Sequence, residues 1–367
     1  MTAHPDRPVM APAPRQPGDD GTTARDLMAG APMAGAPVTR VLVTGAGGPA
    51  AIAAMRSLRA DPTVELIAAD MDPWAAGLYL VPPASRTLVP AGAAPEFAVV
   101  LLALCQELGV HVVLPTVDAE LRPLAGARAT FRAHGIELLL APAAALDIIL
   151  DKLVLAEHCA GVVRVPRTEP LGAETDPSSW TYPVIVKPRS GSGSRGIVKI
   201  ETAAELAALD HAPGLLVQQF LPGAEYSIDV LAGTDGHVIA SVPRLRARVD
   251  SGVSVGGRTV HDPVLEAFGK AVAEATGITY VANVQCKGDA AGRPALLEVN
   301  PRMPGTLGLT IASGVDMPRL ALAALRGQPV PATLGFRDRA MVRFLDERAL
   351  DPAEIEHVAR DLAGHLA

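Results

Sequence analysis

Short apolar segments alternate with helix-length segments through the first part of the chain, and this alternation constrains the fold most. Residues 41–43 (Val-Leu-Val) precede a glycine-rich turn at 45–48 and a helical pattern from Pro49 to about Arg59. Similar apolar segments follow at 66–69, 111–114 and 137–140, with helices expected over about 95–108 and 118–134. Such alternation is typical of a parallel sheet covered by helices.

The pattern changes near residue 141. One or two helices are expected over about 143–160, and strands then follow in succession at 184–187, 196–200, 215–219, 226–231 and 237–242. Gly, Pro and Asp turns between them favour antiparallel pairing. Asp262 and Pro263 predict a helix start and Gly277 its end. Strands at 280–286 and 294–299 and helices at about 305–313 and 316–326 follow, and the last 40 residues are at best an amphipathic helix.

Composition excludes several classes of protein. Hydrophobic residues make up 49% of the 367 residues and charged residues 19%, so a large core can form. A net charge of −7 argues against a nucleic-acid partner or an anionic membrane surface. The longest apolar run is far shorter than the ~20 residues of a membrane span. Three isolated cysteines fit a reducing, cytoplasmic location. Residues 1–37, with seven prolines, are expected to be a disordered tail.

The glycine-rich first turn has the spacing Gly45-x-Gly47-x-x-Ala50, and Asp70 follows the next strand. This spacing matches a permissive form of the dinucleotide fingerprint, so an NAD(P)-dependent oxidoreductase is one hypothesis. The helix that begins after the turn could bind another anion. A small-residue turn is also what any open α/β sheet needs at its first strand, so turn geometry alone is a third interpretation.

A second motif places a lysine at the end of an apolar strand. Lys187 follows residues 184–186 (Val-Ile-Val), and a glycine–serine loop follows the lysine: Ser190, Gly191, Ser192, Gly193, Ser194, Arg195 and Gly196. Backbone N–H groups and hydroxyls of such a loop can bind phosphate oxygens. The order differs from a Walker A motif, in which the lysine ends the loop. A flexible hairpin is the alternative, although burying an ammonium without an anionic partner is costly.

A third motif is a strand that runs into a short connector. Gln218, Gln219, Phe220 and Leu221 are followed by Glu225, seven residues after Gln218. The exposed backbone of a connector can pair with a purine edge, and a carboxylate can accept both ribose hydroxyls. An ordinary turn is the alternative.

The most specific motif lies on the two strands at 280–286 and 294–299. Glu298 and Asn300 are two residues apart, so they face the same side of a strand. Gln285 can lie opposite them if 287–293 forms a hairpin turn. Three oxygen donors on one face suit Mg²⁺ with phosphates and waters. Arg302 adds a fork of N–H donors for an acyl or phosphoryl oxygen; a polar cross-strand network is the alternative.

Weaker candidates concern the substrate. Thr116, Asp118 and Glu120 follow a parallel strand at the edge where open α/β sheets bind ligands, and they could hold an amino group. They could equally cap the next helix, with Asp118 as its N-cap. Arg244 and Arg258, with Arg246, surround the Gly/Ser-rich segment 250–257, and an arginine there could bind a substrate carboxylate through two hydrogen bonds. Solvated surface is the alternative.

In order and spacing these motifs resemble the ATP-grasp superfamily. They are most similar to its carbamoyl-phosphate-synthetase-like branch and to amino-acid ligases such as the pyrrolysine-pathway ligase. The resemblance covers about residues 38–330 and implies a mixed α/β and α+β chain. An N-terminal parallel Rossmann-like (pre-ATP-grasp) domain would span 38–146 and a two-lobed ATP-grasp domain 147–330. Residues 331–367 would form a C-terminal extension.

The resemblance also implies a role for each motif. Lys152 and Lys187 would contact the phosphates of ATP, and the loop at 190–196 would close over the β- and γ-phosphates. The segment 218–221 would bind adenine, and Glu225 would bind the ribose. Two Mg²⁺ ions, or Mn²⁺ in their place, would be held by Gln285, Glu298 and Asn300. Arg302 and Lys187 would be the catalytic residues, with Arg302 stabilising an acyl phosphate.

Three features depart from that family. Gln218 occupies a position that is often Glu, although its amide oxygen can still accept from the adenine amino group. Gln285 is neutral, so one carboxylate serves two metal ions unless ATP supplies most of their ligands. The chain has a single ATP-grasp unit and neither a glutaminase nor an allosteric domain, so it is not a complete carbamoyl phosphate synthetase.

The resemblance implies an ATP-dependent carboxylate–amine ligase that forms an amide or peptide bond through an acyl phosphate. Its partners would be a small-molecule carboxylate and an amine, with amino acids as candidates, and a homodimer remains open. The competing hypotheses are the oxidoreductase that uses Gly45, Gly47 and Asp70, an ATP-grasp carboxylase or kinase-like enzyme, and a catalytically inactive ATP-binding protein.

Overall fold

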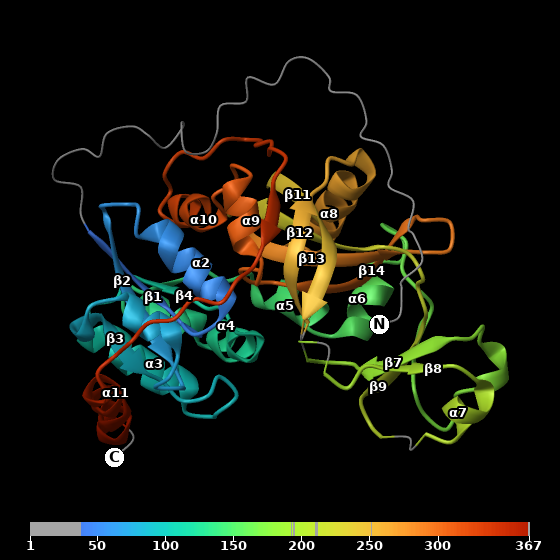
Figure 1. Cartoon of the computed structure of the whole chain (residues 1–367), viewed down its shortest axis with the longest axis horizontal. Helices are drawn as coiled ribbons and strands as arrows, with labels where there is room; N and C mark the ends of the chain where they lie inside the picture. Colours follow the sequence, from blue (N-terminus) through green and yellow to red (C-terminus); the bar gives the residue numbers. More distant parts are fainter. Residues whose placement is uncertain (1–37, 192, 194, 210–211, 251, 366–367) are drawn as a thin grey trace, which may run out of the picture.

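The computed structural model describes residues 38–365 except 192, 194, 210, 211 and 251, so the tail predicted over 1–37 lies outside the described residues. The described part forms a five-stranded, a six-stranded and a four-stranded sheet. In Figure 1 the five-stranded sheet lies at the left, the six-stranded sheet at the centre and the four-stranded sheet at the lower right. This mixed α/β arrangement confirms the predicted fold class.

The five-stranded sheet is parallel throughout, as the alternation of apolar segments predicts, and its order is β3-β2-β1-β4-β5. Its strands are β1 (Thr39–Val43), β2 (Val64–Asp70), β3 (Arg86–Leu88), β4 (Val112–Leu114) and β5 (Glu137–Leu138). Its connecting helices are α2 (Pro49–Leu58), α3 (Phe97–Glu107) and α4 (Asp118–Ala133). Because β1 lies between β2 and β4, the carboxyl ends of these three strands open one crevice.

The six-stranded sheet is antiparallel, in the order β14-β13-β10-β11-β12-β15. Its strands are β10 (Glu225–Ala232), β11 (Val238–Asp250), β12 (Val253–Thr259), β13 (Tyr280–Gly288), β14 (Pro294–Asn300) and β15 (Ala340–Val342). Helix α8 (Pro263–Thr276) packs on β10 and β11. Asp262 caps this helix by accepting from Val264 N at 2.9 Å, and Gly277 ends it in a left-handed conformation, as the sequence predicts.

The four-stranded sheet is a small antiparallel lobe in the order β6-β9-β7-β8. Its strands are β6 (Thr168–Pro170), β7 (Val184–Pro188), β8 (Val198–Ile200) and β9 (Leu215–Gln219), and helix α7 (Ala203–Ala207) lies beside it. Helices α5 (Ala143–Ile149) and α6 (Lys152–Cys159) connect the parallel sheet to this lobe. The lobe has a core of its own around Trp180, Val184 and Val217.

Two regions differ from the predictions. In the Gly/Ser-rich segment 250–257, residues 253–257 lie in β12, which pairs with β11 in irregular register near Arg248. The last 40 residues were expected to be at best helical, yet Ala340–Val342 adds an edge strand beside β12. Three residues give too short a period-2 pattern to detect. The boundaries predicted at 146 and 330 stay predictions.

The C-terminal segment spans two parts of the molecule. After β15, the chain leads to α11 (Pro352–His365), which packs on β3 at the far end of the parallel sheet (Figure 1). Helices α9 (Leu307–Ala312) and α10 (Met317–Leu325) meanwhile pack against α2. None of the helices in the described ranges has the length and hydropathy that a membrane span requires.

Candidate active site

Four polar side chains share one face of the β13–β14 hairpin. Gln285 lies directly opposite Glu298, and Asn283 lies opposite Asn300. The alternation of a strand places both pairs on the same face, and all four line one cavity. The predicted hairpin therefore brings Gln285, Glu298 and Asn300 together.

This group fits a hard divalent cation. It offers amide oxygens and one carboxylate, the donor types that Mg²⁺ accepts together with phosphate and water. The amide groups also contact their neighbours, since Gln285 Nε2 donates to Asn283 Oδ1 at 3.2 Å. Among the described residues no group of three or more His, Cys, Asp or Glu side chains forms a metal site. A metal ion here would therefore depend on Glu298, two amides and the phosphates of a nucleotide.

Both predicted lysines lie next to Glu298. Lys152, the first residue of α6, has its Nζ 3.8 Å from Glu298 Oε2 and donates to the carbonyl oxygen of Gly191 at 2.6 Å. Lys187 is 4% exposed and donates to Gln218 Oε1 at 2.8 Å. Burial lowers the pKa of Lys187 to about 8, and the charge of Glu298 partly opposes this effect. Two cations beside one carboxylate provide a region of positive charge for phosphate oxygens.

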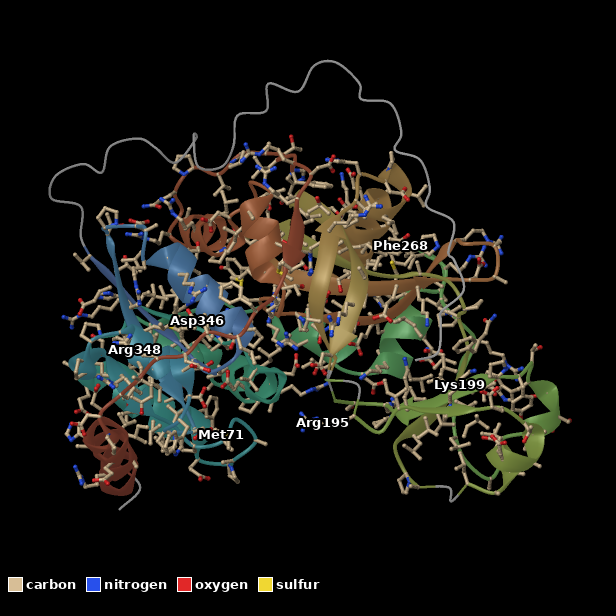
Figure 2. The ribbon with its side chains drawn as sticks, in the orientation of Figure 1. Met71, Arg195, Lys199, Phe268, Asp346 and Arg348 are labelled. Atoms are coloured by element: carbon tan, nitrogen blue, oxygen red, sulfur yellow. The ribbon has the colours of Figure 1, made fainter. Side chains whose placement is uncertain are left out.

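A cavity of about 320 Å³ opens beside Lys152, and Lys187 lines a much smaller recess together with Lys152 and Glu298. The cavity is lined by Asp118, Ala119, Arg122, Ile149, Leu150, Lys152, Ser190, Gly191, Arg195, Glu298, Val299 and Asn300. Ser192 and Ser194 lie outside the described residues, whereas Gly193 and Gly196 have positive φ angles. Figure 2 shows Arg195 between the four-stranded lobe and the parallel-sheet part. The lining of this cavity is suited to a polyphosphate.

The predicted adenine connector begins at the end of β9. Gln218 is buried, and its Nε2 donates to Thr168 Oγ1 at 2.8 Å while its oxygen accepts from Lys187. Lys199 and Lys287 lie 4.9 and 5.2 Å from the centre of the Phe220 ring. The predicted ribose ligand Glu225 lies 3.1 Å from Arg246 Nε. The polar groups of Gln218 and Glu225 thus contact neighbouring protein side chains.

A larger cavity, of about 730 Å³, lies between the β13–β14 hairpin and the parallel sheet. One wall consists of Asn283, Gln285, Glu298, Asn300 and Arg302, with Ser227 and Arg246. The facing wall comes from the first turn, Asp70, Asp72, Thr116 and Glu120. At its edge, Met71 and Trp74 are 60% and 72% exposed, and Figure 2 shows Met71 on the parallel-sheet side. Glu298 and Asn300 line both cavities.

The first turn is not arranged for a dinucleotide. Gly45 has a φ of +59°, and a Cβ there would lie 2.5 Å from Val117 Cγ2, so the glycine serves close packing. Asp70 Oδ2 accepts from Gly47 N at 2.8 Å, and Oδ1 accepts from Asp72 N at 3.1 Å. A carboxylate therefore occupies the N–H at the start of α2, where a pyrophosphate would bind, and would repel it.

Arg302 forms a two-point ion pair across the molecule. Its Nε and Nη2 donate to the two oxygens of Asp118 at 2.9 and 2.7 Å. Asp118 is the first residue of α4 and makes no cap, because Val117 is the N-cap residue and has no side-chain bond to the helix. The suggestion that Asp118 caps α4 is therefore wrong, and its carboxylate orients Arg302 instead.

Replacing Asp118 with asparagine should lower the turnover number for ADP formation by about 10- to 100-fold, because a misplaced catalytic group costs this much. Because Asp118 also lines the smaller cavity, the KM for ATP is measured together with the turnover number. Steady-state kinetics of D118N checks the prediction, with D338N, at an exposed aspartate, as the control. A turnover number equal to that of the wild type would contradict the orienting role.

The arginines predicted for the substrate lie elsewhere. Arg244 is 2% exposed and donates to Asp229 Oδ1 at 2.5 Å and to Thr306 Oγ1. Thr306, the N-cap residue of α9, lines the larger cavity and lies over Arg244. Arg258 is exposed on β12. Of these three arginines, Arg246 lines the larger cavity.

Sequence reasoning missed several residues of these walls, among them Asn283, Ser227 and Asp72. It also gave Arg195 no role of its own. Asn283 lies two residues before Gln285, and this spacing alone signals a shared strand face. Arg195 lies inside the glycine–serine loop, where a basic residue next to a phosphate site is itself a signal. Asn283 also donates to the buried Asp229 at 2.7 Å, a contact that spacing could not predict because Asp229 lies 54 residues away.

Comparisons with protein families agree with this geometry. Residues 41–139 match the PylC-like N-terminal domain, and residues 211–347 match the family described as ATP-grasp in the biosynthetic pathway with Ter operon. The chain therefore combines a PylC-like N-terminal domain with an ATP-grasp domain. This confirms the predicted resemblance.

Individual proteins extend the likeness. The D-alanine–D-alanine ligase of Gloeobacter violaceus is 29% identical over 208 residues, which are 49% of this chain and 68% of that ligase. Seven further curated relatives match over 23% to 59% of their own length.

Two solved structures share the fold at low sequence identity. The L-amino acid ligase of Bacillus licheniformis has a TM-score of 0.61 at 16% identity and covers 79% of this chain and 75% of that one. The biotin carboxylase domain of Hydrogenobacter thermophilus 2-oxoglutarate carboxylase, solved with MgADP and bicarbonate, has a TM-score of 0.65 at 17% identity. It covers 82% of this chain and 72% of that one.

Proposed function

We propose that this protein is an ATP-dependent carboxylate–amine ligase that forms an amide or peptide bond through an acyl phosphate. The observation that carries the proposal is the position of Glu298 and Asn300, which line both cavities. One cavity has Lys152, Arg195 and loop groups that suit a polyphosphate, and the other has room for a carboxylate and an amine. In the proposed reaction, the phosphoryl group passes from one cavity to the other beside these two residues.

In the proposed first step, a substrate carboxylate oxygen attacks the γ-phosphorus of ATP. The new O–P bond forms as the bond to the β–γ bridging oxygen breaks, which gives an acyl phosphate and ADP. Lys152 and Arg195 bind the phosphates from the smaller cavity, and Lys187 binds them from the recess beside it. Arg302 stabilises negative charge on the acyl oxygens from the larger cavity.

In the second step, the amine attacks the acyl carbon and phosphate leaves.

We propose that Gln285, Glu298 and Asn300 hold two Mg²⁺ ions, or Mn²⁺ in their place, with ATP supplying most of the other ligands. Bound Mg²⁺ would neutralise charge on the transferred phosphoryl group. The adenine would lie at 218–221 and the ribose at Glu225.

Amino acids are the substrates we propose first. The supporting relatives are named as ligases of D-alanine and of L-amino acids. The larger cavity adds physical support, because its walls carry both carboxylates and arginines and so match a substrate with charges of both signs. Thr116 and Glu120 are the proposed contacts for an amino group.

Thermal unfolding with different ligands tests the proposal. Mg-ATP at about 100 times its dissociation constant should stabilise the protein by about 2.7 kcal/mol, which raises Tm by about 5–10 °C. ATP with a chelator, NAD⁺ and NADPH should each give a much smaller shift. ADP release should then be screened with single amino acids and pairs of them. A shift with a nicotinamide nucleotide alone would overturn the proposal in favour of the oxidoreductase hypothesis.

A further inference from the structure

Glu120 is a buried carboxyl group that faces the larger cavity. It is the third residue of α4 and only 4% exposed, yet it lines the cavity beside Thr116. Its Oε2 accepts a hydrogen bond from Thr44 Oγ1. A Cβ at Gly92 would lie 2.5 Å from Glu120 Cγ, so the glycine at 92 leaves the room that this side chain occupies. Burying a carboxyl group in this way costs free energy.

The position of Glu120 connects it to the reaction centre. It lies in the first turn of α4, two residues after Asp118, whose carboxylate holds Arg302 at 2.7 Å. The same end of α4 therefore orients the arginine that we place at the acyl phosphate and presents Glu120 to the cavity. An amine next to Glu120 would lie on the parallel-sheet side of the acyl group, opposite the phosphate-binding lysines.

We propose that Glu120 is the general base that takes a proton from the amine substrate before the amine attacks the acyl phosphate. This inference rests on the proposed ligase function and adds a catalytic residue to it. An ammonium has no lone pair, so an amine that arrives protonated cannot react until a base accepts a proton from it. Glu120 is a carboxylate at the amine side of the cavity.

The proton balance of the step is complete. The ammonium R–NH₃⁺ gives one proton to Glu120 and becomes R–NH₂. Its nitrogen forms a bond to the acyl carbon, and the bond from that carbon to the phosphate oxygen breaks. The nitrogen then loses a second proton, which leaves with the phosphate as HPO₄²⁻. Glu120 returns its proton to water, so no oxidant, reductant or further co-reactant is needed.

The charges around Glu120 come from several elements. Asp70 of β2 and Asp72 after it lie on the same wall of the cavity, while Arg246 of β11, Glu298 of β14 and Arg302 lie on the facing wall. Burial raises the pKa of Glu120 to about 7, the hydrogen bond from Thr44 lowers it, and the charge of Asp70 raises it again. Glu120 is therefore an effective base above neutral pH and is protonated, and unable to accept, below it.

Glu120 also has a local structural contact, and the experiment must separate the two roles. Backbone N–H groups of Thr116 and Val117 interact with its carboxyl group, as an acid in the first turn of a helix often does. Glutamine preserves the size and keeps one acceptor oxygen, so Glu120→Gln removes the ability to take a proton while retaining the contacts made to that oxygen.

The test separates activation of the carboxylate from attack by the amine. Each common amino acid is supplied singly with Mg-ATP and hydroxylamine, which is unprotonated at pH 8 and traps acyl phosphates as hydroxamates without a base. Amino acids that give hydroxamate are then supplied with each amino acid as the amine. E120Q should form hydroxamate within about threefold of the wild-type rate. Its rate of amide formation should fall about 100- to 10,000-fold.

Each outcome has one meaning. Wild-type amide rates in E120Q would overturn the role of Glu120, and so would loss of hydroxamate and amide in equal proportion, which would indicate a structural role. Absence of hydroxamate from the wild type with every amino acid would overturn the proposed function itself for these substrates.

A second variant tests the proton directly without altering Glu120. Thr44→Val removes the hydrogen bond that lowers the pKa of Glu120, so the acid limb of the pH–rate profile for amide formation should move to higher pH. The hydroxamate rate should keep its pH profile. An amide profile that does not move would overturn the assignment of that limb to Glu120.

Discussion

Replacing Glu298 with glutamine is expected to lower the rate of ADP formation by about 100- to 1,000-fold, the scale seen when one electrostatic partner of a transition state is removed. Glu298 is the one carboxylate among the four polar side chains that share the β13–β14 face. It also lines both cavities and lies 3.8 Å from Lys152. Glutamine keeps its size but removes the charge that would hold a divalent cation.

Two further variants make this prediction specific. E347Q changes an exposed glutamate and should retain the wild-type rate. Adding Q285E to E298Q returns one carboxylate to the opposite position of the same strand pair, so part of the lost rate should return. Coupled assays of ADP release at several Mg²⁺ concentrations provide the measurement, and unchanged turnover in E298Q would remove the metal assignment.

The parallel sheet and the β13–β14 hairpin could be predicted because their signals are local. Buried strands give apolar runs, and Glu298 and Asn300 are two residues apart on one strand, so periodicity places them on one face. The family comparison then confirms the order of the parts. The short strand β15 and the irregular hairpin β11–β12 lack such a signal, because register shifts near Arg248 break the alternation.

The candidate site could be predicted less completely, because several of its contacts connect distant segments. Arg302 donates to Asp118, which lies 184 residues away in the sequence. Asp70 accepts from the backbone N–H of Gly47, which lies 23 residues away. The motif Gly45-x-Gly47 with Asp70 is compatible with a dinucleotide site in sequence, and only the direction of the Asp70 carboxylate argues against one. Likewise, Arg244 and Arg246 share a strand face. Thr306 nevertheless covers Arg244, which is buried, whereas Arg246 lines the cavity.

Asp229→Asn should destabilise the protein by about 3–5 kcal/mol, the cost of leaving a buried charge without its partner. Asp229 is fully buried, and its carboxylate accepts from Arg244 Nη2 at 2.5 Å and from Asn283 Nδ2 at 2.7 Å. Thr310 Oγ1 donates to the other oxygen at 2.5 Å. An amide in place of this carboxylate turns a donor toward one of these partners and leaves the Arg244 guanidinium uncompensated.

Urea unfolding measures this cost, and a double-mutant cycle assigns it. D338N, at an exposed aspartate, should change the free energy of unfolding by less than about 0.5 kcal/mol. Combining D229L with R244M should cost less than D229L alone, because the double variant removes the unpaired charge along with its partner. A loss below about 1 kcal/mol in D229N would contradict the pairing.

The buried Asp229–Arg244 pair also contacts residues that line the larger cavity. Arg244 bonds to Thr306 and Asp229 bonds to Asn283, and both Thr306 and Asn283 line the cavity. D229N should therefore raise the KM for the substrates more than the KM for ATP, since we propose the smaller cavity for the nucleotide phosphates. Equal changes in the two constants at a temperature well below Tm would separate the pair from the substrate site and leave it a purely stabilising contact.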